Sequence, residues 1–449
     1  MIRKCLRVHL LHDVGVSPIE AWRRLAVLAM TLLLPAAAHA QSCPDPAAVT
    51  TGMDLPLAAV RYLADDALEG RMAGSPGERC AADYIVAAFR RLGIEPAGEA
   101  GSWFQNVALA SVLNPHIQGT GRNVIGMLEG ADPVLRAEFV VIGAHYDHLG
   151  RSSENSLAPD QAGDIHNGAD DNASGVAAML AIAQQLAAGP RPARSVLFLA
   201  FTGEESGLLG SAYFAAHPTV PLEKLTAMVN MDMVGRLGEA PLIVNGVDTA
   251  AEWKTLLEPA AERAGVALAM SGEGYGPSDH TSFYSKDIPV LHFFTNVHGD
   301  YHRPSDDWDR IDGDGIERVA RIVTDVATAV ANRRPILTLQ RGAGEPPPPA
   351  GEATARGSGT WLGTVPDFTP VDRGVRLSGV SPGSPAEKAG MTAGDVLIGF
   401  GEHEIADLQA LTDALRAHKP GDEVEIRLLR DGRDVRMRVV LGARPARQP

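Results

Sequence analysis

Continuous apolar runs along this chain alternate with stretches that have the apolar spacing of helices. The runs are typical of buried strands, and they lie within residues 122–130, 137–148, 195–205, 225–235 and 288–295. Helical spacing marks residues 55–94, interrupted by a Gly/Pro turn at 74–77, and the Ala/Leu-rich stretch 174–189. Buried strands alternating with helices predict an α/β domain whose mixed, largely parallel central sheet is flanked by helices.

A change of composition divides the chain toward its C-terminal end. Residues 341–359 are rich in Pro and Gly, include four consecutive prolines and show no apolar periodicity. Beyond them, short strands alternate with two helical segments, and the last two strands are joined by Asp431-Gly432, a strong hairpin signal. We therefore predict a large domain over residues 41–333, a linker over 334–359 and a small β-rich domain over 360–443.

The first forty residues have the features of a secretory signal. Arg23 and Arg24 precede an apolar stretch from Leu25 to Leu34, and small residues follow at positions 38 and 40. The apolar stretch is shorter than the ~20 residues that a helix needs to cross a bilayer. We expect a signal peptide over residues 1–40, export to the periplasm or the medium, and no permanent membrane span.

Charge and cysteine content refine this picture. The formal net charge is −15, and no basic cluster with interleaved aromatic residues is present, which argues against a nucleic-acid partner. Removal of the signal would take away Cys5 and leave Cys43 and Cys80. In an oxidising compartment these two residues could form one disulfide; two unpaired thiols are the alternative.

Polar side chains gather where the predicted strands end. Because sites in open α/β sheets form beyond the carboxyl ends of the strands, we expect these side chains to converge. The strand-end residues are His145, Asp147, Glu204, Glu205 and Asp232, and two loops add Asp170, Asp171, Tyr301 and His302.

Clustered carboxylates need a positively charged partner. No Lys or Arg lies immediately beside them in the sequence, so a divalent metal is the simplest partner. Histidine and carboxylate without cysteine suit zinc, with manganese and cobalt as alternatives. Taken singly, each residue also has an ordinary structural role: Asp170 or Asp171 could cap the next helix, and Asp232 could belong to a turn. Five such segments together favour a metal site.

The same positions carry the motifs of a known family. In chain order, "GAHYDHLG", "NGADDNASG", "TGEESGLLGS", "NMDMVG" and "YHRPSDD" resemble the co-catalytic zinc aminopeptidases of the leucyl aminopeptidase, aminopeptidase Y and transferrin-receptor family. The resemblance extends over residues 55–332 and implies the zinc exopeptidase fold with two Zn²⁺ per chain. It implies one zinc held by His145 and Glu205, a second held by Asp232 and His302, and Asp171 as the bridge between them.

The resemblance assigns catalytic roles to three further residues. Glu204 would be the general base that takes a proton from a metal-bridged water and delivers it to the leaving amine. In an extended backbone Glu204 and Glu205 would point to opposite sides, which would leave Glu204 facing the substrate. Asp147 would orient the imidazole of His145, and Tyr301 would help to stabilise the oxyanion.

Residues 360–443 resemble a PDZ domain, chiefly through the segment "SPAEKAGMTAGDVL". Such domains add the C-terminal tail of a peptide as a strand beside a carboxylate-binding loop. Here that loop would lie near Leu362–Thr364, where the sequence departs from the usual Gly-Leu-Gly-Phe form. The resemblance therefore implies either a C-terminal peptide ligand or a structural or self-docking role.

Together these features predict an exported metallo-aminopeptidase that removes N-terminal residues from peptides. Alternatives on the same fold are a glutaminyl-cyclase-like transferase with a single zinc and a carboxypeptidase or amidohydrolase. The intact set of ligands argues against a non-catalytic binding protein. The residue preference at the substrate's N-terminus, the PDZ ligand and the oligomeric state stay open.

Overall fold

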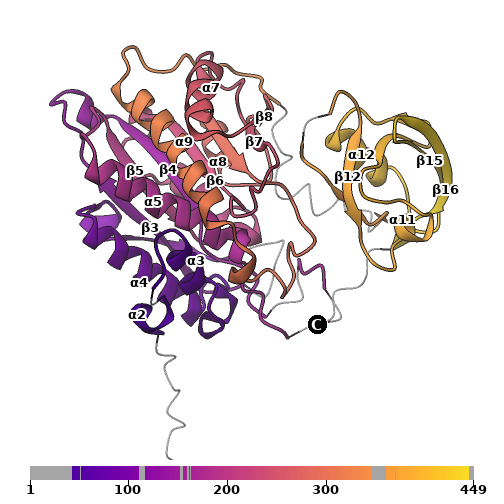
Figure 1. Ribbon diagram of the computed structural model, residues 1–449, viewed down its shortest axis with the longest axis horizontal. Coiled ribbons are helices and arrows are strands. Elements are labelled where there is room, and N and C mark those ends of the chain that lie inside the picture. The colour runs from indigo at the N-terminus through magenta and orange to yellow at the C-terminus, as the bar shows by residue number, and fades with distance from the viewer. Residues whose placement is uncertain are drawn as a thin grey trace, which may run out of the picture. The chain divides into compact units, whose positions relative to one another are not determined.

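The structure is a computed structural model (Figure 1) that describes residues 43–443 apart from 51, 111–116, 152–154, 159, 160, 162, 345–359 and 370. The predicted signal peptide and most of the predicted linker lie outside the described residues. Within the described part, no helix is both long enough and apolar enough to cross a bilayer.

A mixed sheet forms the centre of the large domain (Figure 1). Its strands are β1 (Glu95–Pro96), β2 (Phe104–Ala108), β3 (Thr120–Leu128), β4 (Phe139–His145), β5 (Ser195–Phe201), β6 (Leu225–Met231), β7 (Leu242–Asn245), β8 (Leu268–Met270) and β9 (Val290–Phe294). Their order is β1-β3-β5-β4-β6-β9-β7-β8, and β2 pairs with β3. Strands β5, β4, β6 and β9 run parallel, whereas β3 and β7 join them antiparallel. The predicted mixed α/β sheet is confirmed, and its parallel part is the centre.

Helices cover both faces of this sheet because its central strands are apolar on both sides. In β5, Val196 and Phe198 belong to one core cluster, and Leu197 and Leu199 belong to another. The first cluster includes residues of α3 (Leu57–Leu63), α4 (Pro76–Arg91), α5 (Gly175–Ala188), α7 (Trp253–Ala264) and α9 (Gly313–Asn332). The second includes residues of α6 (Leu209–Ala216) and α8 (His280–Tyr284).

Short helical turns connect these elements. They are α2 (Pro46–Val49), η1 (Asp66–Arg71), η2 (Glu99–Gly101), η3 (Leu135–Ala137), η5 (Ala169–Ser174), η6 (Glu204–Ser206), η7 (Leu222–Lys224) and η8 (Trp308–Arg310). Two of them matter for the site: η5 directly precedes α5, and η6 follows β5 after Thr202 and Gly203.

Residues 334–344, which the sequence assigned to the linker, pack against the large domain. Leu337 is part of its main core cluster, and Leu339 forms an isolated bridge with Ala250. The backbone of Gln340 also donates a hydrogen bond to the carbonyl of Thr249. Leu337 is buried and Leu339 is half-buried, so two leucines anchor a segment that is otherwise mostly exposed, although the Pro/Gly-rich residues after it suggested a linker.

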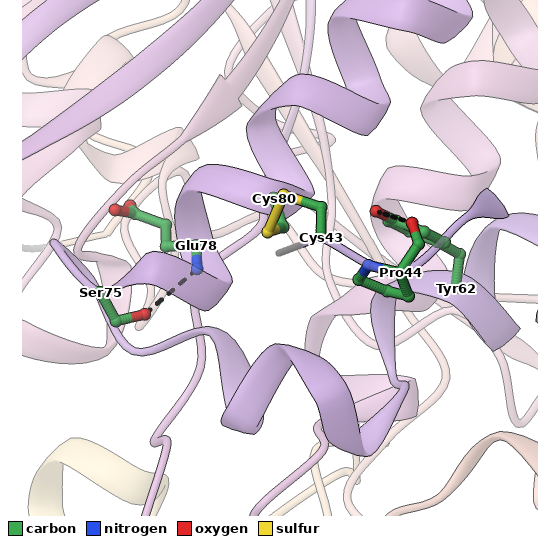
Figure 2. The surroundings of a disulfide bond; sticks show 6 residues. All are labelled: Cys43, Pro44, Tyr62, Ser75, Glu78 and Cys80. Carbon is green, nitrogen blue, oxygen red and sulfur yellow. Dashed lines mark hydrogen bonds between the residues drawn. A yellow bond between two sulfur atoms is a disulfide. The ribbon is translucent and has the colours of Figure 1, made fainter. Parts of the chain in front are cut away.

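Cys43 and Cys80 form a disulfide (Figure 2), which decides between the two alternatives left by the sequence. Cys80 lies in α4, whose first turn is capped by two hydrogen bonds between side chains and backbone. The Ser75 hydroxyl accepts a hydrogen bond from the backbone of Glu78, and the Glu78 carboxylate accepts one from the backbone of Gly74. The disulfide thus ties the segment before α2 to a well-anchored helix.

The small domain is an antiparallel β structure with two helices. Its elements are β10 (Thr360–Trp361), β11 (Thr364–Pro366), β12 (Val375–Val380), α11 (Pro385–Lys388), β13 (Val396–Phe400), β14 (His403–Glu404), α12 (Leu408–Arg416), β15 (Glu423–Arg430), β16 (Arg433–Val440) and β17 (Gly442–Ala443). The main sheet has the order β11-β12-β13-β15-β16. The predicted hairpin is confirmed, since Arg430 pairs with Arg433 across Asp431-Gly432.

Glu78 makes the stability of the large domain depend on pH. Its side chain is buried, and desolvation raises its pKa from 4.5 to about 7, although a hydrogen bond from the Thr202 hydroxyl acts in the opposite direction. The folded state therefore holds this proton more tightly than the unfolded chain does. The resulting stability is fully present below about pH 4.5 and is lost as the pH rises through about 7.

We expect Glu78→Gln to abolish this loss of stability at high pH, which amounts to at most ~3 kcal/mol in the free energy of unfolding. Urea denaturation at about pH 5 and about pH 8 measures it. Glu95→Gln, at an exposed position, is the control and should follow the wild-type curve. An unchanged pH dependence in Glu78→Gln would show that another group is responsible.

Candidate metal centre

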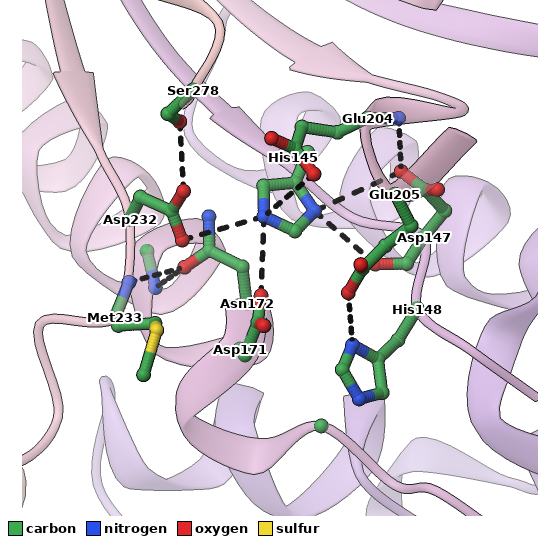
Figure 3. A network of polar contacts seen from close by, with 12 residues as sticks. His145, Asp147, His148, Asp171, Asn172, Glu204, Glu205, Asp232, Met233 and Ser278 are labelled. Carbon is green, nitrogen blue, oxygen red and sulfur yellow. Dashed lines mark hydrogen bonds and ion pairs between the residues drawn. The ribbon is translucent and has the colours of Figure 1, made fainter. Parts of the chain in front are cut away.

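The side chains predicted from the sequence meet beyond the carboxyl ends of the parallel strands. Figure 3 shows six of them: His145, Asp147, Asp171, Glu204, Glu205 and Asp232. His145 ends β4, the two glutamates follow β5 in η6, and Asp232 follows β6. Asp171 comes from η5, and His302 comes from the loop after β9. Parallel strands bring these ends to one edge of the sheet, which is why residues so far apart in the sequence converge.

Two groups of ligand atoms share Asp171. In the first group, Nε2 of His145 lies 3.3 Å from Oδ1 of Asp171 and 3.3 Å from Oδ1 of Asp232. In the second, Nε2 of His302 lies 3.1 Å from Oδ2 of Asp171 and 3.3 Å from Oε2 of Glu205. Each carboxylate oxygen of Asp171 thus faces a different histidine.

This grouping differs from the one that the resemblance implied. His145 lies with Asp232 rather than with Glu205, and Glu205 lies with His302. The cause is the turn η6, which carries Glu205 away from His145 and toward the loops that hold His148 and His302.

The sequence suggested that the two glutamates lie in extended backbone, but they do not. They belong to a 3₁₀ turn that begins after Gly203, which has a φ of 68°. Their side chains nevertheless diverge, because successive residues of a 3₁₀ turn point about 120° apart. Oε2 of Glu204 lies 4.0 Å from Nε2 of His145, whereas Oε1 of Glu205 lies 2.6 Å from Nδ1 of His148.

The spacing of the ligand atoms fits zinc. Zinc binds nitrogen and oxygen at about 2.0–2.1 Å in a tetrahedral arrangement, which places neighbouring ligand atoms about 3.3 Å apart. The N···O separations in both groups are between 3.1 and 3.3 Å. His145, Asp171 and Asp232 also form a compact set of possible ligand atoms, and so do His148, Asp171 and Glu205.

The surroundings shift the pKa values of the two glutamates in opposite directions. Burial raises the pKa of Glu204 well above its ordinary value; the nearby His145 opposes the shift, and Asp232 adds to it. Burial acts in the same direction on Glu205, but the imidazoles of His302 and His148 together outweigh it and lower the pKa of Glu205 to about 2. Glu205 therefore keeps its negative charge, while Glu204 can take up a proton.

Asp147 and Tyr301 lie beside the two groups. Oδ1 of Asp147 is 3.7 Å from Nδ1 of His145, and the main-chain oxygen of Asp147 is closer, at 3.3 Å. The same Oδ1 accepts a hydrogen bond of 3.1 Å from the backbone of Glu204. The ring of Tyr301 stacks on His302 with a centroid distance of 3.9 Å.

A cavity of about 340 Å³ opens onto both groups. Carboxylates and apolar side chains share its lining: Glu204 and Asp232 on one hand, and Met233, Phe294 and Val297 on the other. The cavity thus combines negative charge with room for an apolar group.

Sequence reasoning missed three residues that shape this site. His148 stands inside one of the quoted motifs but was given no role. Asn172, in another motif, donates to the carbonyl of Met231 and accepts from the backbone of Met233, which joins η5 to the end of β6. Arg71 stands in residues 67–85, which belong to the region that resembles the family, but it precedes the five motifs and was given no role.

Arg71 is a fully buried cation behind the site. Burial lowers its pKa to about 10, so it stays charged at neutral pH. Its guanidinium donates hydrogen bonds to the main-chain carbonyls of Leu63, Tyr146, Asn167 and Gly168. It thereby fastens η1 to the segment after β4 and to the segment before η5.

Arg71→Lys should destabilise the protein by about 3 kcal/mol or more. An ammonium group cannot donate to all of these carbonyls, and each buried carbonyl left without a partner costs about 1–3 kcal/mol. Urea denaturation with the disulfide intact measures the effect. Arg263→Lys replaces an exposed arginine paired with Asp325 and should stay within about 0.5 kcal/mol of wild type. Equal stability of the two variants would contradict the role of Arg71.

Comparisons with known proteins agree with this geometry. Residues 123–327 match the model of peptidase family M28, and residues 366–441 match that of the PDZ domain. The chain is 30% identical over 216 residues to Aminopeptidase YwaD of Bacillus subtilis, a match that covers 46% of this chain and 44% of that protein. It is 29% identical over 238 residues to a probable leucine aminopeptidase of Arthroderma otae, covering 47% and 64%. The chain thus spans about half the length of these relatives.

A solved structure supports the fold assignment. A Zn-dependent exopeptidase from Parabacteroides distasonis aligns with a TM-score of 0.51 at 22% identity, over 65% of this chain and 100% of that chain. At this identity the likeness concerns the fold alone. By these sequence matches, residues 123–327 are similar to peptidase family M28 and residues 366–441 are similar to the PDZ domain.

Proposed function

We propose that the protein is an exported metallo-aminopeptidase that binds two Zn²⁺ and releases N-terminal residues from peptides. The observation that carries this proposal is the divided Asp171 carboxylate, whose two oxygens face separate histidines. The names of the two relatives, Aminopeptidase YwaD and probable leucine aminopeptidase, support the class of reaction.

The proposed ligands follow the two groups of atoms. His145 and Asp232 would hold one ion, His302 and Glu205 would hold the other, and Asp171 would bridge them. Zinc at these positions would supply a Lewis acid for the scissile carbonyl and lower the pKa of a water molecule.

Glu204 is the proposed general base. It lies beside the first group without joining it, and its raised pKa suits a group that must take up a proton and release it again. It would accept a proton from the attacking water and pass it to the amine that leaves. Asp147 would hold the turn of Glu204 in place through the hydrogen bond to its backbone. Tyr301 lines the cavity and is the proposed oxyanion donor.

The cavity suits the N-terminal residue of a peptide. A free α-ammonium group is positively charged and would be attracted by the carboxylates of the lining. The apolar side chains Met233, Phe294 and Val297 would receive an apolar first side chain. An acylated N-terminus lacks the charge, so blocked peptides should be poor substrates.

Export and a second peptide-binding function complete the proposal. The signal-like residues 1–40 and the disulfide between Cys43 and Cys80 both suit an oxidising compartment. The PDZ domain would bind the C-terminal end of a peptide or serve a structural role.

The two glutamates should be separable by mutation. Glu204→Gln should keep two zinc ions per chain and lose roughly 10²–10⁴-fold in kcat, because only the proton carrier is removed. Glu205→Gln should lose one of the two ions, since it removes a proposed ligand. Zinc analysis and hydrolysis of leucyl-p-nitroanilide measure both. A Glu204→Gln variant with full turnover would contradict the mechanism.

The requirement for a free N-terminus gives a second test. Wild-type protein should cleave a free leucyl peptide, fail on the N-acetylated form, stop after chelation and recover with added zinc. Equal rates on free and acetylated peptides would exclude the aminopeptidase assignment. Conversion of N-terminal glutamine to pyroglutamate, without release of a residue, would favour the transferase instead.

A further inference from the structure

His148 is a buried histidine at the metal centre to which the proposed mechanism gives no role. The residue is 1% exposed, and its Nδ1 lies 2.6 Å from Oε1 of Glu205. Figure 3 shows the ring next to Glu205 with one nitrogen joined to the carboxylate. Neither atom has a hydrogen bond with any described residue, so no hydrogen bond between them is formed at 2.6 Å. A small rotation of either side chain would form that bond.

The distance between these atoms distinguishes two roles for His148. Two ligands of the same tetrahedral zinc stand about 3.3 Å apart, as His302 and Glu205 do at 3.3 Å. Nδ1 of His148 and Oε1 of Glu205 are only 2.6 Å apart, which is the distance of a strong, charge-assisted hydrogen bond. His148 is therefore placed to donate to Glu205 rather than to share a metal with it.

The two oxygens of Glu205 then have different partners. Oε2 faces His302, in the second group of ligand atoms. Oε1 faces His148. A hydrogen bond on Oε1 would fix the rotation of the carboxylate and leave Oε2 as its ligand atom.

The backbone around His148 holds the ring in this position. The backbone N–H of His148 donates to the carbonyl of Arg71, whose guanidinium in turn donates to the carbonyl of Gly168. Gly168 has a φ of 54°, and a Cβ there would come within 2.4 Å of Cγ of His148. The ring thus packs directly against a glycine backbone that is tied to the same arginine.

We propose that His148 is a positioning residue for the metal centre: its Nδ1–H donates to Oε1 of Glu205 and fixes Glu205 as a ligand through Oε2. This inference rests on the proposed function, because it concerns the zinc that Glu205 would hold. Groups that orient metal ligands in this way typically change metal affinity by about 10–100-fold.

The test is a zinc titration of the metal-free, full-length protein against a chromophoric chelator. His148→Leu should lower the affinity for one of the two zinc ions by about 10–100-fold and leave the affinity for the other unchanged. His148→Asn should recover most of the loss, because its side-chain amide can donate from nearly the position of Nδ1. His166→Leu is the matched control: this buried histidine bonds to Ser156 and should not alter zinc affinity.

The experiment distinguishes failure of this inference from failure of the proposed function. Wild-type affinity for both ions in His148→Leu would overturn the proposal, as would equal losses in the Leu and Asn variants. Wild-type protein that binds no zinc would instead overturn the proposed function on which this inference rests.

A measurement on the wild-type protein covers the case in which His148→Leu does not fold. Nitrogen-15 NMR of histidine-labelled protein should show that Nδ1 of His148 carries a proton both before and after zinc is added. Loss of that proton on zinc binding would mean that His148 binds the metal itself, and the positioning role would be wrong.

Discussion

Negative charge crowded at one edge of a sheet is the constraint on which this structure depends. Asp171, Glu204, Glu205 and Asp232 are all nearly buried within one small region. Such a cluster is tolerated only if cations and imidazoles are brought close and held there. Two histidines stand between the carboxylates, and a buried arginine binds the backbone behind them. The turns η5 and η6 and the segment around Arg71 are arranged to meet this demand.

The sequence predicted much of this arrangement, because the parallel strands end where their apolar runs end. His145 and Asp232 could be placed at the site for that reason alone. The division of ligands into two groups could not be predicted, because it depends on the path of a turn rather than on a strand. Gly203 has a left-handed conformation, and so does Leu208, a non-glycine residue whose type gives little sign of it.

Two other features were out of reach of pattern reasoning for different reasons. Arg71 acts through main-chain carbonyls, and carbonyls carry no signature in a sequence. Leu337 belongs to the core of the large domain, but it stands in front of a Pro/Gly-rich stretch and was assigned to the linker with it. In the small domain, by contrast, local turn chemistry was sufficient, as the hairpin at Asp431-Gly432 shows.

The disulfide has a consequence for a chain that would remove N-terminal residues one at a time. Such an enzyme at high concentration meets its own N-termini as substrates. Cys43 is bonded covalently to Cys80 in α4, so stepwise trimming of residues before it would end there. Even if the bond after Cys43 were cut, this residue would stay attached to Cys80 through the disulfide. Oxidation would therefore set the limit of self-digestion and give the protein a defined N-terminal boundary.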